Sequence, residues 1–568
     1  MENKGSRKSI VICEYISTGI NYVDDALARG YTPVLVEGPY VGSPEDVERL
    51  RAVRERINRR MKGKVRIIKE DPDYDNILRQ VKETDPEVIL AGSEFGVALA
   101  ARLAADLGLK GNPVERIPYM IRKDMMQKAL AEHGLRTVRG RAVRSDREAL
   151  EFFRHLGKNE VVVKPVRGAG SQGVHLCRGQ VEMLEMVRNH LNELREQGAE
   201  DPAVLVQECI KGTEYVVNTV SCNGKHRVVS VGAYDKYRLD NGSIAYNYFR
   251  YITRLEVGHS RLLRYACSVA DAIGIKYGPV HGEYMVDEEG PVLIEVNCRP
   301  MGGGLMRKYS ELISGQHETD SALDSYLDPE KFHLDSLKPY SVKRFGVSKD
   351  LVLTSDTEVI SAPVLQICKR LKSYYSASYD QIGRTTMLQQ TTDMETEAGL
   401  VYLIHDDEQQ VREDCELLHL LELRYPDILF QKSDEGKTTP KVTRNIRHVM
   451  EAAECHGATV VFSDHPEKVS GAAVITQQDL KNAYDSYDQG IIDLSDPRSF
   501  ADLESVIQQI FVFMDKVRAG GRVIVPESTY CHLPYGIEGM EILFRVSGML
   551  LELPAADESG LLIATVQE

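Results

Sequence analysis

One short segment restricts the fold more than any other part of the sequence. Residues 281–297 read HGEYMVDEEGPVLIEVN, and residues 287–290 within them, DEEG, supply the material of a turn. Gly290 can adopt the left-handed backbone conformation that a short hairpin loop often needs. Because side chains alternate along a strand, one face is expected to carry Tyr284, Val286, Val292, Ile294 and Val296. The segment therefore predicts an antiparallel hairpin with one apolar face.

The opposite face of this hairpin brings like charges together. With the loop centred on Glu289, His281 lies opposite Asn297. The same register places Glu283 opposite Glu295, where two carboxylates about 5 Å apart repel by roughly 3 kcal/mol at an effective dielectric of about 20. A hard divalent cation offsets this repulsion, since Mg²⁺ prefers one or two carboxylates together with water and phosphate oxygens. The pattern predicts a metal site, with a solvated surface hairpin as the alternative.

A glycine-rich stretch lies between two predicted strands. Residues 168–173, GAGSQG, spell G-x-G-x-x-G directly after the apolar run at 161–165. A dinucleotide-binding fingerprint needs its glycines to join a strand to a helix, with an acidic residue about 20 positions further on. Residues 174–177 instead alternate in the manner of a strand and are followed by a turn. The stretch therefore predicts a flexible loop between two strands, with Lys164 at its base, that can hold phosphates through backbone amides.

The first hundred residues alternate between apolar strands and amphipathic helices. Strands are predicted at 9–15, 32–38, 65–70 and 87–93, and helices at 20–29, 44–60, 75–84 and 95–107. Such alternation is typical of an open, doubly wound parallel sheet. This part of the chain is therefore expected to be α/β, of the Rossmann-like type.

Beyond residue 111 the pattern changes to antiparallel strands mixed with helices. Strands are predicted at 160–165, 174–177, 203–210, 213–222, 225–238 and 247–257, and helices at 124–133, 180–197 and 259–273. This part is expected to be α+β around antiparallel sheets.

Composition excludes several classes of partner. The 568 residues suggest three or four domains of roughly 100–200 residues each. The formal net charge of -15 leaves no basic stripe for nucleic-acid phosphates, so no nucleic acid is expected. The sequence contains no run of about 18 apolar residues, so no membrane span is expected. The ten cysteines form no C-x-x-C pair and the first residues lack a signal-peptide apolar region, so a reduced, cytoplasmic protein is expected.

Five motifs in order resemble the ATP-grasp superfamily. They are Lys123, VVVKPVRGAGSQGV, VLVQECIKGTEY, HGEYMVDEEGPVLIEVN and the following CRPMGGG. Within that superfamily the chain is similar to the carboxylate–amine ligases, such as the bacterial L-amino-acid ligases that make dipeptides. The resemblance implies an ATP-grasp fold with a pre-ATP-grasp domain at 1–112, a small lid and nucleotide-binding lobe at 113–210, and a catalytic lobe with closing subdomain at 211–425.

The resemblance also implies which residues bind the nucleotide. The phosphates of ATP would be held by Lys123, Lys164, Gly168, Gly170, Ser171 and Gly173. The adenine edge would meet a hinge of Glu208, Cys209 and Ile210, and the ribose hydroxyls would meet Glu214. Mg²⁺, with Mn²⁺ as an alternative ion, would be held by Glu283, Glu295 and Asn297.

The implied reaction joins an acid to an amine. A substrate carboxylate attacks the γ-phosphorus of ATP to give an acyl phosphate and ADP, and an amine then attacks the acyl carbon. Arg299 would stabilise the oxyanion of that step and Lys164 would position the phosphates. His281 is read either as packing support or as a substrate contact. Gly302 and Gly303 are read either as amides that hold a substrate carboxylate or as a tight structural turn.

The identity of the acid and the amine is not visible in the sequence. Residues 233–251, rich in tyrosine with Lys236, Arg238 and Arg250, are candidate selectors of an amino-acid substrate. An ordinary antiparallel hairpin with surface tyrosines is the alternative reading of that stretch. Small-molecule substrates are the expected partners, and a homodimer is left open.

The last part of the chain, 426–568, resembles a class I methyltransferase domain. Strands are expected at DILFQK, ATVVFSD, YDQGIIDLS and GGRVIVPE, helices at 442–456 and 498–518, and a final hairpin from EILFRV to TVQE. The place of the glycine-rich cofactor loop reads SDEGKTTP, with one glycine only. A degenerate, structural or dimerising domain is therefore favoured over an active second enzyme, although Asp464 stands where an acid would hold a ribose.

Three other functions are weighed against the ligase. A dehydrogenase built on GAGSQG lacks the helix that such a site needs. A biotin-type carboxylase would share the ATP machinery and would depend on bicarbonate. A non-catalytic nucleotide-binding assembly protein has little use for Glu283, Glu295, Asn297 and Arg299 in one place.

Overall fold

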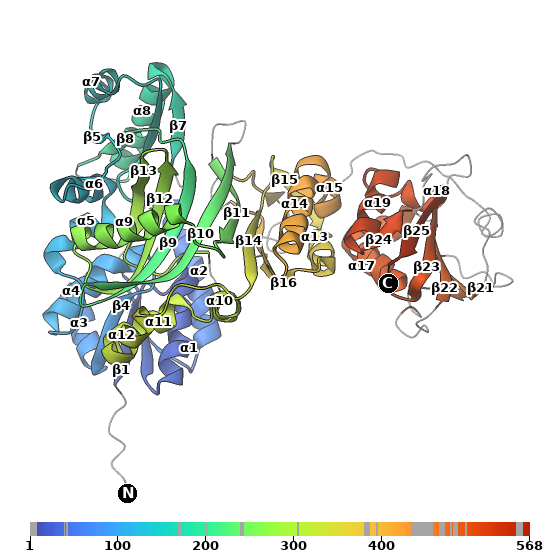
Figure 1. Ribbon diagram of the computed structural model, residues 1–568, viewed down its shortest axis with the longest axis horizontal. Helices are drawn as coiled ribbons and strands as arrows, with labels where there is room; N and C mark the ends of the chain where they lie inside the picture. Colours follow the sequence, from blue (N-terminus) through green and yellow to red (C-terminus); the bar gives the residue numbers. More distant parts are fainter. Residues whose placement is uncertain are drawn as a thin grey trace, which may run out of the picture. The chain divides into compact units, whose positions relative to one another are not determined.

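The computed structural model describes residues 8–38, 40, 44–168, 173–199, 201–238, 244–303, 306–379, 387–392, 396–432, 458–464, 472–476, 480, 487–494, 497–551 and 561–567. The chain divides into two compact units, Met1–Val347 with Thr392–Glu395, and Ser348–Thr391 with Thr396–Glu568. Both units are mixtures of helices and strands (Figure 1). None of the helices in these ranges is long and apolar enough to cross a membrane.

A parallel sheet begins the first unit. Its strands are β1 (Ser9–Cys13), β2 (Thr32–Val36), β3 (Arg66–Ile68) and β4 (Pro86–Ala91), in the order β3-β2-β1-β4. The intervening helices are α1 (Asn21–Ala28), α2 (Pro44–Met61), α3 (Tyr74–Lys82) and α4 (Val97–Asp106). The predicted alternation of strands and helices is confirmed, with ends that differ by a few residues.

Both faces of this sheet are covered, as a doubly wound sheet requires. Val11 and Ile89 point to a core that includes α3 and α4, while Ile12 and Leu90 point to a core that includes α1. The period-two alternation of the strands divides the apolar residues between these two cores.

Next along the chain comes a lobe built on a small antiparallel sheet. Helices α5 (Ile117–Ile121) and α6 (Lys123–Glu132) lead into strands β5 (Gly140–Val143), β6 (Glu160–Pro165), β7 (His175–Arg178) and β8 (Val204–Glu208), in the order β5-β8-β6-β7. Helices α7 (Asp146–Leu156) and α8 (Gln180–Glu196) cover one face of the sheet (Figure 1). The glycine stretch joins β6 to β7, so the prediction of a loop between two strands is confirmed.

A second antiparallel sheet forms the centre of the unit. Its strands are β9 (Thr213–Cys222), β10 (Lys225–Arg238), β11 (Ile244–Tyr251), β12 (Tyr277–Asp287) and β13 (Gly290–Asn297), in the order β13-β12-β9-β10-β11. Helix α9 (Val257–Ile273) packs on one face through Leu262, Ala266 and Val269. Helices α10 (Arg307–Ser314), α11 (Glu318–Leu327) and α12 (Pro329–Ser336) follow in the chain.

The hairpin β12–β13 has the predicted pairs and one unpredicted irregularity. His281 pairs with Asn297 and Glu283 with Glu295, as the sequence predicts. A β-bulge then follows, because Tyr284 pairs with Leu293 and leaves Ile294 without an opposite residue. The prediction that Ile294 lies on the apolar face is therefore wrong. Leu293 occupies the core in its place.

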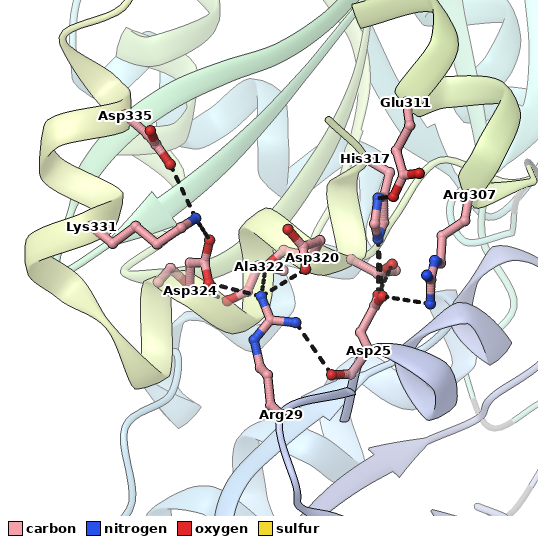
Figure 2. A network of polar contacts seen from close by, with 12 residues as sticks. Asp25, Arg29, Arg307, Glu311, His317, Asp320, Ala322, Asp324, Lys331 and Asp335 are labelled. Carbon is pink, nitrogen blue, oxygen red and sulfur yellow. Dashed lines mark hydrogen bonds and ion pairs between the residues drawn. The ribbon is translucent and has the colours of Figure 1, made fainter. Parts of the chain in front are cut away.

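A polar network joins α1 to the helices that follow the central sheet (Figure 2). The buried carboxylate of Asp25 lies 3.0 Å from Nε2 of His317 and 3.2 Å from NH1 of Arg307, and it accepts a hydrogen bond of 2.6 Å from the hydroxyl of Thr319. On the same helix, Arg29 forms ion pairs with Asp320 and Asp324. Such buried charge networks hold two elements in one arrangement because every partner is satisfied.

Strands and helices of the second unit form two groups. The first contains β14 (Phe345–Leu351), in which the chain enters this unit, β15 (Thr357–Ser361), β16 (Tyr374–Ser378), β17 (Met387–Leu388), β18 (Gly399–His405), β19 (Gln431–Lys432), α13 (Val364–Ile367), α14 (Glu408–Arg424) and α15 (Pro426–Leu429). The first three residues of the DILFQK segment therefore lie in α15, and only its last two form a strand. Residues 433–457, which hold SDEGKTTP and the predicted helix at 442–456, lie outside the described residues.

The second group is a six-stranded sheet of order β21-β20-β22-β23-β25-β24. Its elements are β20 (Thr459–Ser463), β21 (Ala472–Ile475), β22 (Tyr487–Asp493), α17 (Leu503–Met514), β23 (Val517–Pro526), α18 (Glu527–Tyr530), α19 (Ile537–Val546), β24 (Met549–Leu551) and β25 (Leu561–Val566). Strands β21, β20, β22 and β23 are parallel, whereas β25 is antiparallel to both of its neighbours. The expected hairpin from EILFRV is wrong in its first half, because this segment lies in α19.

Removal of a buried charge in the second unit is expected to destabilise it strongly. Lys349 and Glu422 are almost fully buried and lie 2.6 Å apart, and the Val352 amide donates to the same carboxylate. Lys349→Met removes the cation closest to the buried carboxylate and leaves it with the Val352 amide and the His419 ring 3.6 Å away, and we expect a loss of about 3–5 kcal/mol in the free energy of unfolding. Urea unfolding followed by circular dichroism, with hydrogen exchange at the Val352 amide, measures it.

The exposed pair Arg412–Glu408 on α14 provides the control. Its charged atoms lie 3.2 Å apart in solvent, so Arg412→Met is expected to change stability by less than about 1 kcal/mol. Equal losses in both variants would contradict the buried-pair argument.

Candidate active site

A cavity lined by many of the predicted site residues lies between the two antiparallel sheets of the first unit. Its volume is about 190 Å³. The predicted site residues that line it are Lys123, Lys164, Gly168, Glu208, Cys209, Ile210, Glu214, Glu283, Glu295, Asn297 and Arg299. Residues from distant parts of the sequence thus converge on one space.

Strand alternation explains why these side chains face the cavity. On β6, Val161 and Val163 point into the core beneath α7 and α8, which turns Val162 and Lys164 to the cavity. On the central sheet, Tyr284 lies in the core, so its neighbour Glu283 lies on the cavity side. The apolar pattern of each strand therefore fixes where its charged residues point.

Two buried lysines form a cationic end of the cavity. Lys123 donates a 2.6 Å hydrogen bond to the carbonyl of Gly168 and lies 3.1 Å from the Glu295 carboxylate. Burial lowers the pKa of Lys164 to about 8, and the charge of Lys123 adds to this shift. An anion bound between the two ammonium groups would relieve their repulsion, so this end suits phosphate.

Only part of the glycine stretch is described. Gly168 and Gly173 both have positive φ angles, of 117° and 67°, which favour glycine. A Cβ atom at Gly173 would also lie 2.9 Å from the His190 ring. The predicted residues Gly170 and Ser171 lie outside the described residues.

Carboxylates and an amide from the hairpin form an oxygen-rich wall. Glu283 and Glu295 are opposite each other, and Asn297 donates a 3.1 Å hydrogen bond to Glu295 Oε1. Asn297 Oδ1 is buried and has no hydrogen-bond partner among the described residues. Two carboxylates and a free amide oxygen on one face are suitable ligands for Mg²⁺, so these residues fit the predicted ion.

His281 supports this wall from behind. It is 2% exposed, and its Nε2 lies 3.1 Å from Glu283 Oε1 and its Nδ1 2.8 Å from Asn218 Oδ1. Burial would raise the pKa of Glu283, but His281 and the nearby cations outweigh it and lower the pKa to about 2. His281 does not line the cavity, which favours the packing-support reading over a substrate contact.

The hinge and the neighbouring strand supply the other end of the cavity. The side chain of Glu208 is held by Arg139 through hydrogen bonds of 2.7 and 2.9 Å. A ligand in the cavity can therefore bind the backbone groups of Glu208, Cys209 and Ile210. Glu214 forms a 2.6 Å ion pair with Lys236.

Lys236 also decides between the two readings of residues 233–251. Its ammonium group lies 4.1 Å from the ring centre of Tyr246, and Lys236 lines the cavity. Tyr246 and Tyr251 are each 5% exposed, so the alternative of surface tyrosines is wrong for them. Arg250 is exposed, and the side chain of Arg238 lies outside the described residues.

Arg299 has an acidic neighbour that the sequence analysis missed. Its Nε lies 4.0 Å from Glu94 Oε2, and burial raises the pKa of Glu94 to about 8. Glu94 follows the carboxyl end of β4, next to the point where the strand order reverses, which is where open α/β sheets place ligands. That position is the sequence signal that could have identified it.

The glycines after Arg299 do not line the cavity. Gly302 accepts a 3.4 Å hydrogen bond from the Thr18 hydroxyl, and Gly303 has a φ of 76°. Both lie in a turn that leads away from β13, which agrees with the structural reading of this segment.

Comparison with known proteins agrees with this geometry. Residues 158–307 match the ATP-grasp domain family. Dapdiamide A synthase from Enterobacter agglomerans is 27% identical over 347 residues, which cover 60% of this chain and 80% of that protein. Phosphoribosylamine–glycine ligase from Methanopyrus kandleri is 29% identical over 168 residues, which cover 27% of this chain and 37% of that protein.

A solved structure shares the fold. The L-amino acid ligase from Bacillus licheniformis superposes with a TM-score of 0.55 and 17% identity, covering 73% of this chain and 98% of that chain. The carboxyaminoimidazole ribonucleotide synthase from Aspergillus clavatus, complexed with ATP, has a TM-score of 0.53, 13% identity, and coverage of 73% and 99%. The chain has the ATP-grasp fold.

The class of enzyme follows from the fold, the site and the relatives together. The chain is an ADP-forming carbon–nitrogen ligase with the ATP-grasp fold.

Nucleotide binding is expected to take up a proton near pH 8. Lys164 is then about half protonated in the free protein, whereas bound phosphates favour its charged form. ATP affinity should therefore fall as the pH rises above 8. Calorimetry in buffers of different ionisation enthalpy should show uptake of up to about half a proton. Lys164→Arg stays charged and should bind without this uptake; unchanged uptake in that variant would assign the proton elsewhere.

The hairpin carboxylates are expected to control metal affinity. Glu295→Gln removes one of the two facing charges and should weaken binding of Mn²⁺, used as a probe for Mg²⁺, by more than about tenfold. Electron paramagnetic resonance of Mn²⁺ measures this directly. Glu288→Gln, on the exposed turn of the same hairpin, should leave the affinity unchanged. Equal affinities in both variants would remove Glu295 from the metal site.

Proposed function

We propose that this enzyme joins the carboxylate of an amino acid or other small acid to the amine of an amino acid, with dipeptides as the favoured products. The reaction proceeds through an acyl phosphate and releases ADP and phosphate. The observation that carries the proposal is the convergence of a phosphate-binding end, a metal-binding wall and a buried arginine on one cavity.

The chain's own residues provide most of the chemistry. Lys123 and Lys164 donate to the phosphates of ATP and hold the γ-phosphoryl group in line with the attacking carboxylate. Burial of both ammonium groups makes their interaction with a bound anion stronger than it would be in water. The backbone of Gly168 lies at the wall of the cavity, where it can help to keep water from the acyl phosphate.

Arg299 acts in the second half of the reaction. The guanidinium group is 8% exposed and lies two residues beyond the hairpin. From that position it stabilises the oxyanion that develops when the amine attacks the acyl carbon. Glu283, Glu295 and Asn297 would hold Mg²⁺, which when bound neutralises charge on the transferred phosphoryl group.

The amino-acid substrate is supported by two observations. Dapdiamide A synthase is a relative over 347 residues of this chain, and the L-amino acid ligase shares the fold. Lys236, held between an acid and an aromatic ring at the cavity wall, is suited to orient a carboxylate or a ribose.

The second candidate function for this fold is that of a biotin-type carboxylase. A biotin carboxylase from Campylobacter jejuni superposes with a TM-score of 0.51 at 12% identity. Its chemistry would require bicarbonate, whereas amide formation would not.

We also propose that residues 426–568 form a degenerate methyltransferase-like domain with a structural or dimerising role. Four parallel strands followed in the sheet by the antiparallel strand β25, which lies between β23 and β24, support this reading. The protein is proposed to act in the cytoplasm on small molecules, without nucleic acid or membrane as partner.

The acyl phosphate gives the sharpest test of the ligase. An acid labelled with ¹⁸O in its carboxylate should transfer one labelled oxygen to the released phosphate, because the bond to the acyl carbon breaks when the amine attacks. ADP release over a matrix of amino acids with Mg²⁺ identifies the acid and the amine. Release that depends on bicarbonate, with no label in phosphate from any amino acid, would refute amide formation in favour of the carboxylase.

Arg299→Met should separate the two half-reactions. We expect the overall rate to fall by about 10²–10³, with ATP affinity little changed, because the variant lacks only the oxyanion contact. Steady-state kinetics together with ATP binding measure the two effects. An equal loss of ATP affinity would show that Arg299 serves nucleotide binding.

A further inference from the structure

A second cavity of the first unit lies outside the site described above. It is about 20 Å³ in volume, which is the size of one water molecule or one dehydrated ion. Among its described lining residues, Val229 is apolar and all others carry polar side chains, including Thr18, Ser230, Tyr251, Gln316 and Glu318. A polar cavity of this size suits a single small polar guest.

Two oxygen atoms in this lining have no protein partner. Glu318 Oε1 and Gln316 Oε1 are buried and accept no hydrogen bond from the described residues. The orientation of both groups is fixed by their other atoms. Glu318 Oε2 accepts a 2.7 Å hydrogen bond from the Met301 amide, and Gln316 Nε2 donates a 3.1 Å hydrogen bond to the Val229 carbonyl.

The carboxylate also has little compensating charge. Glu318 is 8% exposed, and burial raises its pKa to about 7, against the opposing effects of the Met301 amide and Arg299. A neutral water molecule could satisfy both oxygens but would leave the negative charge uncompensated. A cation would satisfy both requirements.

Size and ligand type indicate the class of cation. Mg²⁺ keeps several of its waters, for which about 20 Å³ leaves no room, and Ca²⁺ affinity rises with the number of charged ligands, of which this lining has one carboxylate. A single carboxylate among neutral amide and hydroxyl oxygens matches a monovalent ion, whose hydration shell neutral protein oxygens can replace. We propose that this cavity binds a dehydrated monovalent cation of the K⁺ type between Glu318 and Gln316.

The cavity wall is held rigidly from behind. In the segment 316–319, His317 contacts the buried carboxylate of Asp25 (Figure 2). The Thr319 hydroxyl donates a hydrogen bond to the same carboxylate. Arg307 already occupies a third side of that carboxylate. The Asp25 network is therefore satisfied internally, and it fixes the backbone that presents Gln316 and Glu318.

The cation would act on the active site through one turn. Glu318 holds the Met301 amide, and Thr18 donates to the Gly302 carbonyl. Met301 and Gly302 lie two and three residues after Arg299 in the chain. A bound cation would therefore steady the segment that positions Arg299, and Glu318 would be a positioning residue.

Thermal unfolding tests the site without reference to ligase activity, so its result is independent of the proposed function. Replacing choline chloride by KCl at equal ionic strength should raise the unfolding midpoint by about 2 °C at a tenfold excess of K⁺ over its dissociation constant. Glu318→Gln should abolish this rise, while Glu330→Gln, an exposed acid on α12, should retain it. A rise that persists in Glu318→Gln would place the cation elsewhere and overturn the proposal.

Crystals of the unmodified protein grown with Rb⁺ or Tl⁺ provide a second test that does not depend on a variant folding. An anomalous peak between the side chains of Glu318 and Gln316 is expected. A water molecule there, with no anomalous signal and no K⁺-dependent stability, would mean that Glu318 is protonated and that the cavity is a simple water site.

Discussion

The repulsion between Glu283 and Glu295 is the constraint around which the first unit is organised. Two carboxylates opposite each other in a hairpin are unfavourable unless cations lie close to them. Lys123 lies 3.1 Å from Glu295, and the buried ring of His281 lies 3.1 Å from Glu283, whose pKa is lowered to about 2. The ammonium group of Lys123 offsets part of the repulsion, and a metal ion held by both carboxylates would offset the rest.

The same constraint connects the two antiparallel sheets. Lys123 begins α6 and contacts both Glu295 on the central sheet and the backbone of Gly168 next to the small sheet. A single buried ammonium group thus links the metal-binding wall to the phosphate-binding loop. The ion pair with Glu295 offsets part of the cost of burying this lysine.

Much of this arrangement follows from local sequence patterns. The pairs of His281 with Asn297 and of Glu283 with Glu295 were predicted from a loop centred on Glu289. At the tip the strands pair one residue closer, with Asp287 opposite Gly290, and the bulge restores the predicted register at the site. The bulge at Ile294 could not be predicted, since an extra residue leaves no mark in a run of apolar side chains. Glu94 and Glu318 were missed because each is a single acid whose neighbours come from distant parts of the chain. The segment of α19 was misread because a short apolar run fits a strand and a buried helix equally well.

The bulge in the hairpin has a further consequence for how this protein can vary. At the tip, Asp287 pairs with Gly290 in one register, and beyond Ile294 the ladder continues in another. The extra residue therefore separates the pairing register of the turn from that of the metal-ligand residues. Relatives could have a longer, shorter or differently substituted tip, and the acidic pair would stay aligned as long as the bulge is retained.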